Sequence, residues 1–379
     1  MASVVLRRPF AVESTRESDL STQSIPKLPP EIVLHVISLM DPTSQRRTLV
    51  GVNRFLTEEV ERRTYRKVDM TALGPRRAQF IAAIQSDRRR AGYVRTLALG
   101  ALDMSDSLPV DELHLFHSFE NIRSLIIHHE PSSHVSRMSS TIKHCQFPQL
   151  TNFHSSWSLN DPAFRLFLSR HPSLRSLGLR KSYSLSFGMP SSFPTGLLPA
   201  LEDVDGHWSN VVRLVAGRPI QRVVIRSANS DAYIPRHKLA VILPIVARSA
   251  SGAGVETLTL HVQRADADLI NMVAKSLPSL RSLRLVGTSP VITTSTNSDT
   301  SANVQELELR AALIALALTQ FERLDEFAID RLLPLAAPRY VELVGGVSPA
   351  LRSLRIRDTL WTRVDVHHAW QNESEDEYK

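Results

Sequence analysis

Hydrophobic residues recur in one short window along most of this chain. In each window, apolar side chains occupy positions 1, 4 and 6, and mostly polar residues separate them. Alternation around positions 4 and 6 is typical of a strand that buries one face, because neighbouring strand side chains point to opposite sides. The pattern therefore predicts a long series of short strands. The complete windows are 94–99, 122–127, 174–179, 220–225, 255–260, 280–285, 304–309, 324–329 and 351–356, and windows 150–153 and 201–204 keep two of the three positions.

The spacing of these windows predicts a repeat architecture. Successive windows begin 19 to 35 residues apart, and most intervals match the roughly 20 to 29 residues of leucine-rich repeats. The phrase Leu-Arg-Ser-Leu recurs at Leu174, Leu280 and Leu351. Segments between windows, such as 163–170, 210–216, 265–276 and 311–319, have the spacing and end signals of helices. Because such repeats bury their core only by stacking, we expect an α/β leucine-rich-repeat solenoid over 67–370, curved, with parallel strands on its concave face.

The N-terminal part of the chain follows another pattern. Residues 1–24 are polar and rich in Ser and Thr, which predicts a disordered tail. Apolar residues then follow at helical spacing, including Ile32, Val36 and Met40. Asp41-Pro42 ends this helix, because proline disfavours helix at the residue before it, and 43–55 and 56–66 predict two more short helices. Residues 371–379 are mostly acidic and predict a second disordered tail.

The net charge of +7 belongs to the first quarter of the chain. Residues 1–99 contain 17 basic and 10 acidic residues, and the remainder is balanced. A basic segment suits phosphate groups, and it suits an acidic protein partner equally well. Aromatic residues are not regularly interleaved with the arginine clusters, so bases would have no stacking platform. We therefore expect protein partners and no nucleic acid.

Several other functions lack support in the sequence. No stretch approaches the roughly 18 to 20 apolar residues of a membrane span, so no membrane association is expected. The single cysteine, Cys145, allows neither an internal disulfide nor a cysteine-based metal site. His114 and His117 have helical spacing but no zincin-type motif, so neither a metal nor another cofactor is predicted. No Gly-rich phosphate loop or Gly-x-Ser-x-Gly motif occurs, and an enzyme is not expected. The expected compartment is the cytoplasm, the nucleus or both.

Two short motifs resemble a known family. Residues 28–32, Leu-Pro-Pro-Glu-Ile, are similar to the opening of the F-box, and residues 52–55, Val-Asn-Arg-Phe, resemble its second signature. The box covers about 25–66, and the windows that follow are similar to fungal F-box proteins with leucine-rich repeats. The resemblance implies a three-helix module that binds the Skp-type adaptor of a cullin ubiquitin ligase. It assigns five residues to the adaptor contact or its support: Leu28, Pro29, Ile32, Val36 and Phe55.

Strand periodicity also predicts a binding surface. Side chains at positions 3, 5 and 7 of each window point to the concave face. They are mostly charged or polar with few aromatic residues, which suits a protein or peptide better than an apolar ligand. Trp157 and Trp208 follow their windows at the rim, where they either bind a partner or cap the core. The candidate substrate-binding residues are Arg180, Asp205, His207, Arg226, Arg284, Arg310 and Arg355.

Two functions stay open on these grounds. One is the substrate-recognition subunit of an SCF-type ubiquitin ligase, with the F-box on the adaptor and the repeat body on a protein substrate. The alternative is a leucine-rich-repeat scaffold that assembles proteins without ligase association. Co-purification with the adaptor distinguishes the two.

Overall fold

The chain forms two compact units. The computed structural model describes residues 30–41, 44, 48–49, 54–71, 75–100, 114–128, 142–179, 193–227, 233–252, 254–263, 265–287, 300–330, 337–348, 350–356, 359–364 and 369–373. The units are Met1–Val60 and Glu61–Lys379, called here the N-terminal unit and the repeat unit. Their border falls within helix α3 (Arg54–Arg66), shortly before residue 66, where the F-box is expected to end.

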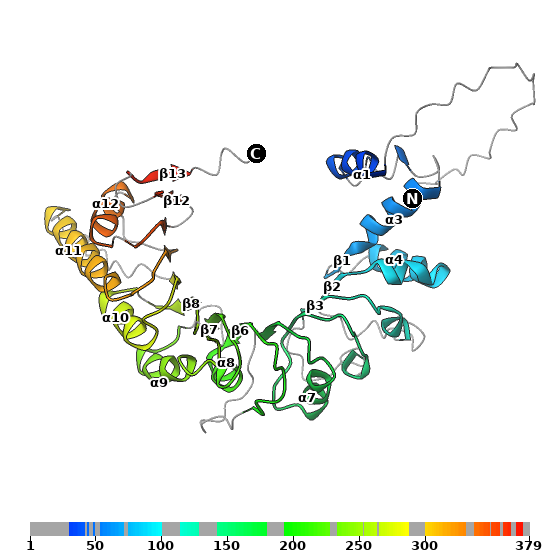
Figure 1. Ribbon diagram of the computed structural model, residues 1–379, viewed down its shortest axis with the longest axis horizontal. Helices are drawn as coiled ribbons and strands as arrows, with labels where there is room; N and C mark the ends of the chain where they lie inside the picture. Colours follow the sequence, from blue (N-terminus) through cyan, green and yellow to red (C-terminus); the bar gives the residue numbers. More distant parts are fainter. Residues whose placement is uncertain are drawn as a thin grey trace, which may run out of the picture. The chain divides into compact units, whose positions relative to one another are not determined.

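The repeat unit is built on one open sheet whose 13 described strands follow one another in chain order (Figure 1). Neighbouring strands from β1 to β11 pair in parallel, and β12 and β13 are added in antiparallel orientation. This confirms the predicted α/β class and the parallel sheet. The strands are β1 (Lys67–Met70), β2 (Thr96–Leu99), β3 (Ser124–Ile127), β4 (Asn152–Ser155), β5 (Ser176–Leu179), β6 (Asp203–His207), β7 (Arg222–Arg226), β8 (Thr257–Val262), β9 (Ser282–Gly287), β10 (Glu326–Ile329), β11 (Ser353–Ile356), β12 (Thr359–Thr362) and β13 (Gln371–Glu373).

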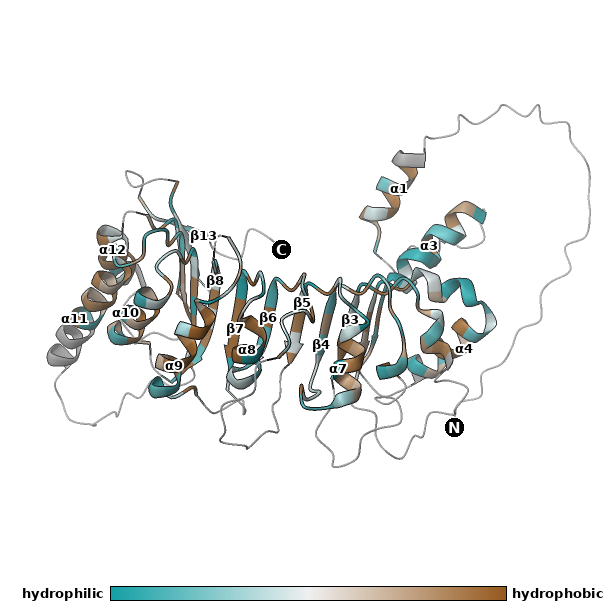
Figure 2. Ribbon diagram, turned by 60° about the horizontal axis from the view of Figure 1, so that its bottom comes forward, coloured by the Kyte–Doolittle hydropathy of each residue, from teal (hydrophilic) through white to brown (hydrophobic). Residues whose placement is uncertain are grey.

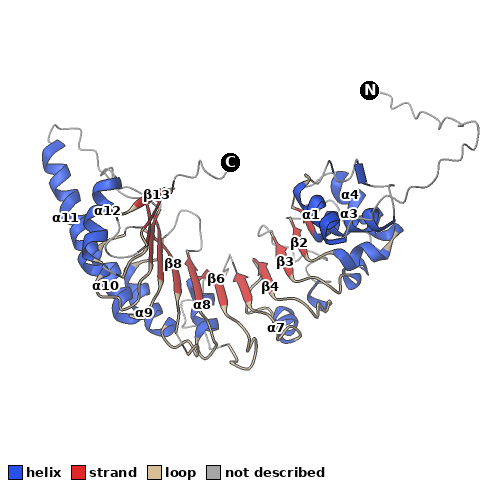
Figure 3. Cartoon of the chain, turned by 45° about the horizontal axis from the view of Figure 1, so that its top comes forward, coloured by secondary structure: helices blue, strands red, loops and turns tan. Residues whose placement is uncertain are grey.

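The helices of the repeat unit cover the outer side of its curved sheet, so the strands line the concave side (Figures 1 and 3). Helices and strands both carry hydrophobic and hydrophilic residues (Figure 2), because each element packs one face on the core and leaves the other outside. The helices are α4 (Pro75–Ser86), the 3-10 helices η1 (Arg88–Tyr93) and η2 (His114–Ser118), α7 (Pro162–Ser169), α8 (Trp208–Val215), α9 (Arg236–Val246), α10 (Ala267–Ser276), α11 (Thr300–Leu318) and α12 (Ala337–Val347).

The repeated windows determine the backbone register. Every window except 304–309 contains a strand, and its apolar residues at positions 4 and 6 are buried. The carbonyl of position 2 accepts two hydrogen bonds from the next repeat: Arg95 O accepts from the N–H groups of Arg123 (2.8 Å) and Ser124 (3.0 Å). The same pair of bonds recurs along the described repeats as far as Asp325 O. Core packing and this carbonyl ladder therefore favour one register together.

One predicted strand is wrong. Window 304–309 lies within helix α11, and β9 pairs directly with β10. Positions 1 and 4 of the window are three residues apart, which also fits one face of a helix, and its Glu, Leu and Ala neighbours favour helix. Buried Ala311, Ile314 and Leu318 continue this helical spacing. Arg310 therefore belongs to an outer helix and not to the concave face, which corrects its assignment as a substrate-binding residue.

A continuous hydrophobic core lies between the sheet and the outer helices, and it includes one fully buried cation, Arg218. Burial lowers the pKa of Arg218. Two of its acceptors lie in the last turn of α8, where the helix dipole favours a positive charge. Arg218 thereby ties α8 to the segment 193–197. Its guanidinium donates to the carbonyl oxygens of Phe193, Pro194, Leu197, Arg213 and Leu214.

A buried arginine also ends the parallel part of the sheet after β11. The N–H of Arg363 donates to Arg352 O at 3.0 Å, the position-2 carbonyl that would otherwise receive a further repeat. Its guanidinium donates to Leu351 O (2.7 Å) and Gly345 O (3.0 Å) and lies 4.7 Å from the centre of the Trp370 ring. A Cβ at position 345 would collide with Trp370, so this close approach requires glycine.

The predicted C-terminal tail begins too early. Gln371–Glu373 form strand β13, which pairs with Leu360, Trp361 and Thr362 of β12. These backbone contacts are not visible in the acidic composition from which the tail was predicted. Residues 1–24 and 374–379 lie outside the described residues.

Candidate functional site

The concave face has two halves of different chemistry. In the described strands, β2 to β5 place no Lys, Arg, Asp or Glu on it, whereas β6 to β11 carry a mixture of charges. The residues of the uncharged half are Thr96, Ala98, Ser124, Ile126, Asn152, His154, Ser176 and Gly178. The charged residues of the other half are Asp203, Asp205, Arg222, Arg226, Arg284, Glu326, Asp330 and Arg355.

The uncharged half has small side chains and one close contact. The imidazole of His154 on β4 lies over Gly178 on β5, and any Cβ at position 178 would meet the ring. Glycine is therefore required there, and the surface between these strands stays shallow. This half offers neutral hydrogen-bonding groups, such as the Asn152 amide and the Ser124 hydroxyl, to a partner.

The charged half is organised by a pair of groups from β6 and β7. Arg226 donates to both carboxylate oxygens of Asp205, at 2.6 and 3.1 Å, and its Nη1 lies 3.2 Å from Nε2 of His261 on β8. Guanidinium has no acceptor, so Nε2 of His261 must accept and the proton of this ring sits on Nδ1. Burial and the neighbouring Arg226 both lower the pKa of His261. His261 therefore presents an N–H donor beside a fixed bidentate ion pair.

A second bidentate pair lies on β9 and the end of β10. Arg284 donates through Nε and Nη2 to Asp330, at 3.1 to 3.3 Å. Arg355, two strands from Arg284 with Ala328 between them in the register, has no carboxylate of the described chain within ion-pair distance. The carboxylates of Asp205 and Asp330 are thus occupied, while Arg284 Nη1 and the Arg355 guanidinium remain as donors for a ligand.

His207 lies on this face of β6 but is used to begin a helix. Its side chain is only 7% exposed, and its Nδ1 accepts from the N–H of Ser209 at 3.4 Å as the N-cap of α8. Burial, followed by the charge of Lys238, lowers its pKa to about 4. Lys238 itself lies 4.7 Å from the centre of the Trp208 ring. Helix α8 therefore begins at Trp208, two residues before the predicted helical segment 210–216, and His207 offers little surface to a substrate.

The other predicted side chains have mixed outcomes. Asp205, Arg226, Arg284 and Arg355 all lie on the concave strands, whereas Arg180 lies outside the described residues. Trp157 is buried against Phe153, Phe164 and Phe167, so it caps the core. Burial raises the pKa of the Cys145 thiol to about 11, which makes it a poor nucleophile.

Among the residues of the charged half that were absent from the predicted set, two contact residues that belong to it. His261 and Asp330 occupy position 7 of their windows, so the same periodicity could have identified them. What the sequence does not show is that they contact Arg226 and Arg284, which come from other repeats.

A second candidate surface lies on the N-terminal unit. Helix α1 (Pro30–Leu39) exposes one apolar stripe, with Ile32 48%, Val36 50% and Leu39 75% exposed, and buries Ile37 on another side. The spacing of four and three residues places these three side chains on one face. Phe55, at the start of α3, is 49% exposed. Leu28 and Pro29 lie outside the described residues.

The segment between the described helices of this unit also has helical contacts. The N–H of Ser44 donates to Asp41 Oδ1 at 3.0 Å, which is an N-cap contact. The Thr48 hydroxyl donates to Ser44 O at 2.7 Å, with the four-residue spacing of a helix. Asp41 thus follows the first helix and caps the helical turn at Ser44.

Among the described residues, no helix has both the length and the apolarity to cross a membrane, and no group of three or more His, Cys, Asp or Glu side chains is placed to hold a metal ion. Comparison of the chain with protein-family models gives no match. Comparison with curated proteins gives no match either.

Proposed function

We propose that the chain is a substrate-recognition subunit of a cullin-type SCF ubiquitin ligase. The F-box of residues 25–66 binds the Skp-type adaptor, and the concave face of the repeat unit holds a protein substrate. The chain acts by proximity: it brings the substrate to the ligase, and the bond to ubiquitin is formed by other subunits.

The apolar stripe of α1 carries this proposal. Ile32 and Val36 are two of the residues that the F-box resemblance assigns to the adaptor contact, and both are about half exposed. Adjacent exposed apolar side chains at helical spacing are typical of a face that docks on another protein. If the stripe belonged to the hydrophobic core, its side chains would be buried.

The charged half of the concave face supports the substrate part of the proposal. Its ion pairs, Asp205 with Arg226 and Arg284 with Asp330, hold the guanidinium groups in fixed orientations. Ordered charges on a repeat surface give specificity for a complementary protein surface more than raw affinity. A small apolar ligand would instead need an apolar cavity.

Adaptor co-purification tests the docking part. The double variant Ile32→Asp, Val36→Asp should lose the Skp-type adaptor, because a charge buried at an apolar contact costs several kcal/mol, about 3 or more. Val241→Asp is the matched control, since Val241 is also 50% exposed but lies on α9 of the repeat unit. The control should keep the adaptor.

Each result has a distinct meaning. Full adaptor binding by the double variant removes the F-box assignment. An unaltered chain that binds no adaptor, yet still captures proteins through its concave face, is the leucine-rich-repeat scaffold of the alternative. Substrate capture is measured with the double variant, which cannot deliver its substrate for degradation. Arg284→Glu, added to that variant, should weaken the capture if the charged half binds substrate.

A further inference from the structure

The first elements of the repeat unit have an excess of basic residues, and their acidic residues are bonded within the fold. Between Glu61 and Arg95, the C-terminal half of α3, β1, α4 and η1 carry many more basic than acidic residues. The three described acidic residues of this segment, Glu61, Asp69 and Asp87, all have internal partners.

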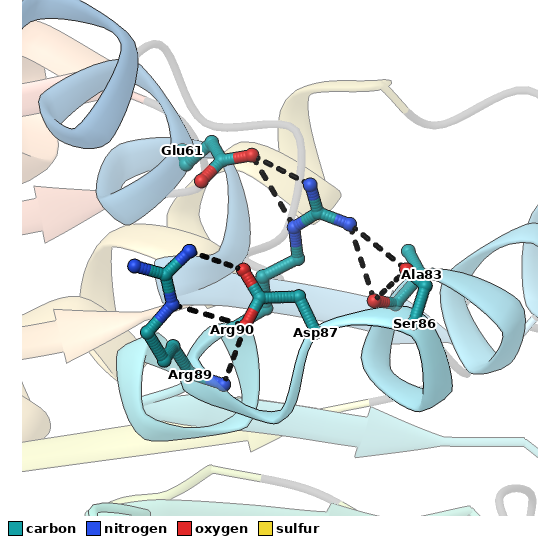
Figure 4. Close-up of polar contacts among 6 residues, drawn as sticks. All are labelled: Glu61, Ala83, Ser86, Asp87, Arg89 and Arg90. Carbon is teal, nitrogen blue, oxygen red and sulfur yellow. Dashed lines mark hydrogen bonds and ion pairs between the residues drawn. The ribbon is translucent and has the colours of Figure 1, made fainter. Parts of the chain in front are cut away.

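The carboxylates are used to hold the elements together (Figure 4). Glu61 on α3 accepts from Nε and Nη2 of Arg90, at 3.3 and 2.7 Å, and Arg90 also reaches Ala83 O on α4 at 3.2 Å. Asp87 caps η1 through the N–H of Arg89 (3.1 Å) and binds the guanidinium of the same residue. These contacts neutralise the carboxylates within the fold and fix the position of η1 against α3.

The cationic side chains, in contrast, point outward. Arg62, Arg66, Lys67, Arg88 and Arg89 are all exposed, and Asp69 is the only exposed carboxylate of the described residues 61–100. Arg62 and Arg66 share one face of α3 at a spacing of four residues. Arg62 lies 5.8 Å from the centre of the ring of Tyr93, the last residue of η1. Arg88 and Arg89 are the first two residues of the same 3-10 helix. These five exposed cations, which come from α3, β1 and η1 at the first end of the repeat unit, are called here the basic end.

Three members of the basic end have no internal counter-charge. Within the described part of the chain, no carboxylate lies within ion-pair distance of Arg66, Lys67 or Arg88. Asp69 accepts from the N–H and hydroxyl of Thr71, and these hydrogen bonds lower the pKa of its carboxyl. Four arginines and one lysine that stay exposed on a braced scaffold form a surface suited to carboxylates.

We propose that the basic end is a second docking surface and that it binds an acidic segment of a protein partner. It lies at the first strand of the sheet, where Lys67 is in register with Thr96 of the concave face, so it is distinct from the charged half of β6 to β11 and independent of the ligase function. A protein is favoured over nucleic acid for two reasons. Tyr65 and Tyr93 are packed under Arg90 and Arg62, so no free ring is presented to a base. Asp69 also places one negative charge among the cations. A protein partner can position its separate carboxylates away from Asp69, whereas the continuous phosphate backbone of a nucleic acid would be repelled by it.

Fluorescence anisotropy on the full chain tests the proposal. The probe is a labelled polyglutamate peptide, and an uncharged Gly-Ser peptide of equal length is the negative control. Polyglutamate should bind, and more weakly as salt rises, because exposed ion pairs are screened. The triple variant Arg66→Glu, Lys67→Glu, Arg88→Glu should lose at least about tenfold in affinity, since each reversal replaces an attraction by a repulsion.

A charge-matched variant excludes a general effect of net charge. Lys275→Glu, Arg281→Glu, Arg323→Glu changes the charge equally at exposed sites elsewhere on the repeat unit, and it should alter affinity less than about twofold. Equal losses in both triple variants would overturn the proposal. A single-stranded DNA oligonucleotide that outcompetes polyglutamate, and whose binding falls in the Arg66 triple only, would reassign the surface to nucleic acid.

A milder variant protects the test against misfolding. Arg66→Gln, Lys67→Gln, Arg88→Gln removes the charges without adding repulsion, and it should give a smaller loss of polyglutamate affinity than the Glu triple. Thermal melts of all three variants should match the unaltered chain, because the altered side chains are exposed. A Gln triple that folds normally and binds polyglutamate as tightly as the unaltered chain would refute the proposal.

Discussion

Leu283 and its neighbour Arg284 allow the repeat register to be tested with two substitutions. Leu283 lies at position 4 of its window, is 0% exposed, and sits in the sheet between Leu258 of β8 and Phe327 of β10. Leu283→Ala removes buried methyl and methylene groups and leaves a cavity. Both flanking strands are hydrogen-bonded to β9, so the backbone has little freedom to collapse into it. We expect a loss of about 2 to 5 kcal/mol in the free energy of unfolding.

Arg284 is the matched position, one residue further along the same strand. Its side chain is 49% exposed on the concave face and pairs with Asp330. Arg284→Ala removes an ion pair that solvent screens, so we expect a loss of at most about 1 kcal/mol. The two substitutions differ by one step along the strand, yet their stability costs should differ severalfold.

Thermal and urea unfolding of the two variants measure the difference. Leu283→Ala should melt clearly below the unaltered chain, and Arg284→Ala should melt close to it. If Arg284→Ala melted below Leu283→Ala, the inward and outward positions would be exchanged. The register of β9, and with it the whole concave-face assignment, would then be wrong.

Two further predictions concern buried polar side chains. The pKa of His207 falls from its ordinary 6.5 to about 4 in the fold, so the unfolded chain binds the proton more readily and stability is lost as pH falls from 6.5 through 4, by up to about 3 kcal/mol. His207→Asn keeps a capping side chain and should lose less stability in urea melts over this range; an unchanged acid sensitivity would contradict the assignment. Arg218→Met should destabilise the chain by about 3 to 5 kcal/mol, because five carbonyl groups, three of them in buried hydrogen bonds, lose their donor. Arg218→Lys should rescue little in the same melts, because an ammonium group cannot span these acceptors.

The strands of the repeat unit were predictable because their apolar positions repeat with a fixed spacing. A side chain such as Leu97 or Leu354 must face the core in every repeat, and the sequence records this directly. The same spacing failed at 304–309, since residues three apart also share a helix face. Only the pairing of β9 with β10 shows which interpretation is correct.

The candidate site was predictable only in part. Strand alternation identifies Arg226 and Arg284 as outward-facing, because direction is a local property of the strand. It fails for His207, whose strand continues into α8 without a loop, so the outward position becomes a buried helix cap. His261, which contacts Arg226, comes from a different repeat. Whether two side chains of neighbouring repeats touch depends on their lengths and rotamers, which the spacing of apolar residues does not reveal.

The closing role of Arg363 limits how such an array can grow. Every parallel repeat ends on a position-2 carbonyl that is ready to receive another unit, and an open end of this kind could recruit a second molecule and extend into a fibre. The N–H of Arg363 donates to the carbonyl of Arg352, and its guanidinium donates to the carbonyls of Leu351 and Gly345, so none of these is left for a further repeat. Duplication of a repeat during evolution would therefore have to occur upstream of β11, and the antiparallel β12 and β13 would be carried along unchanged as the terminator.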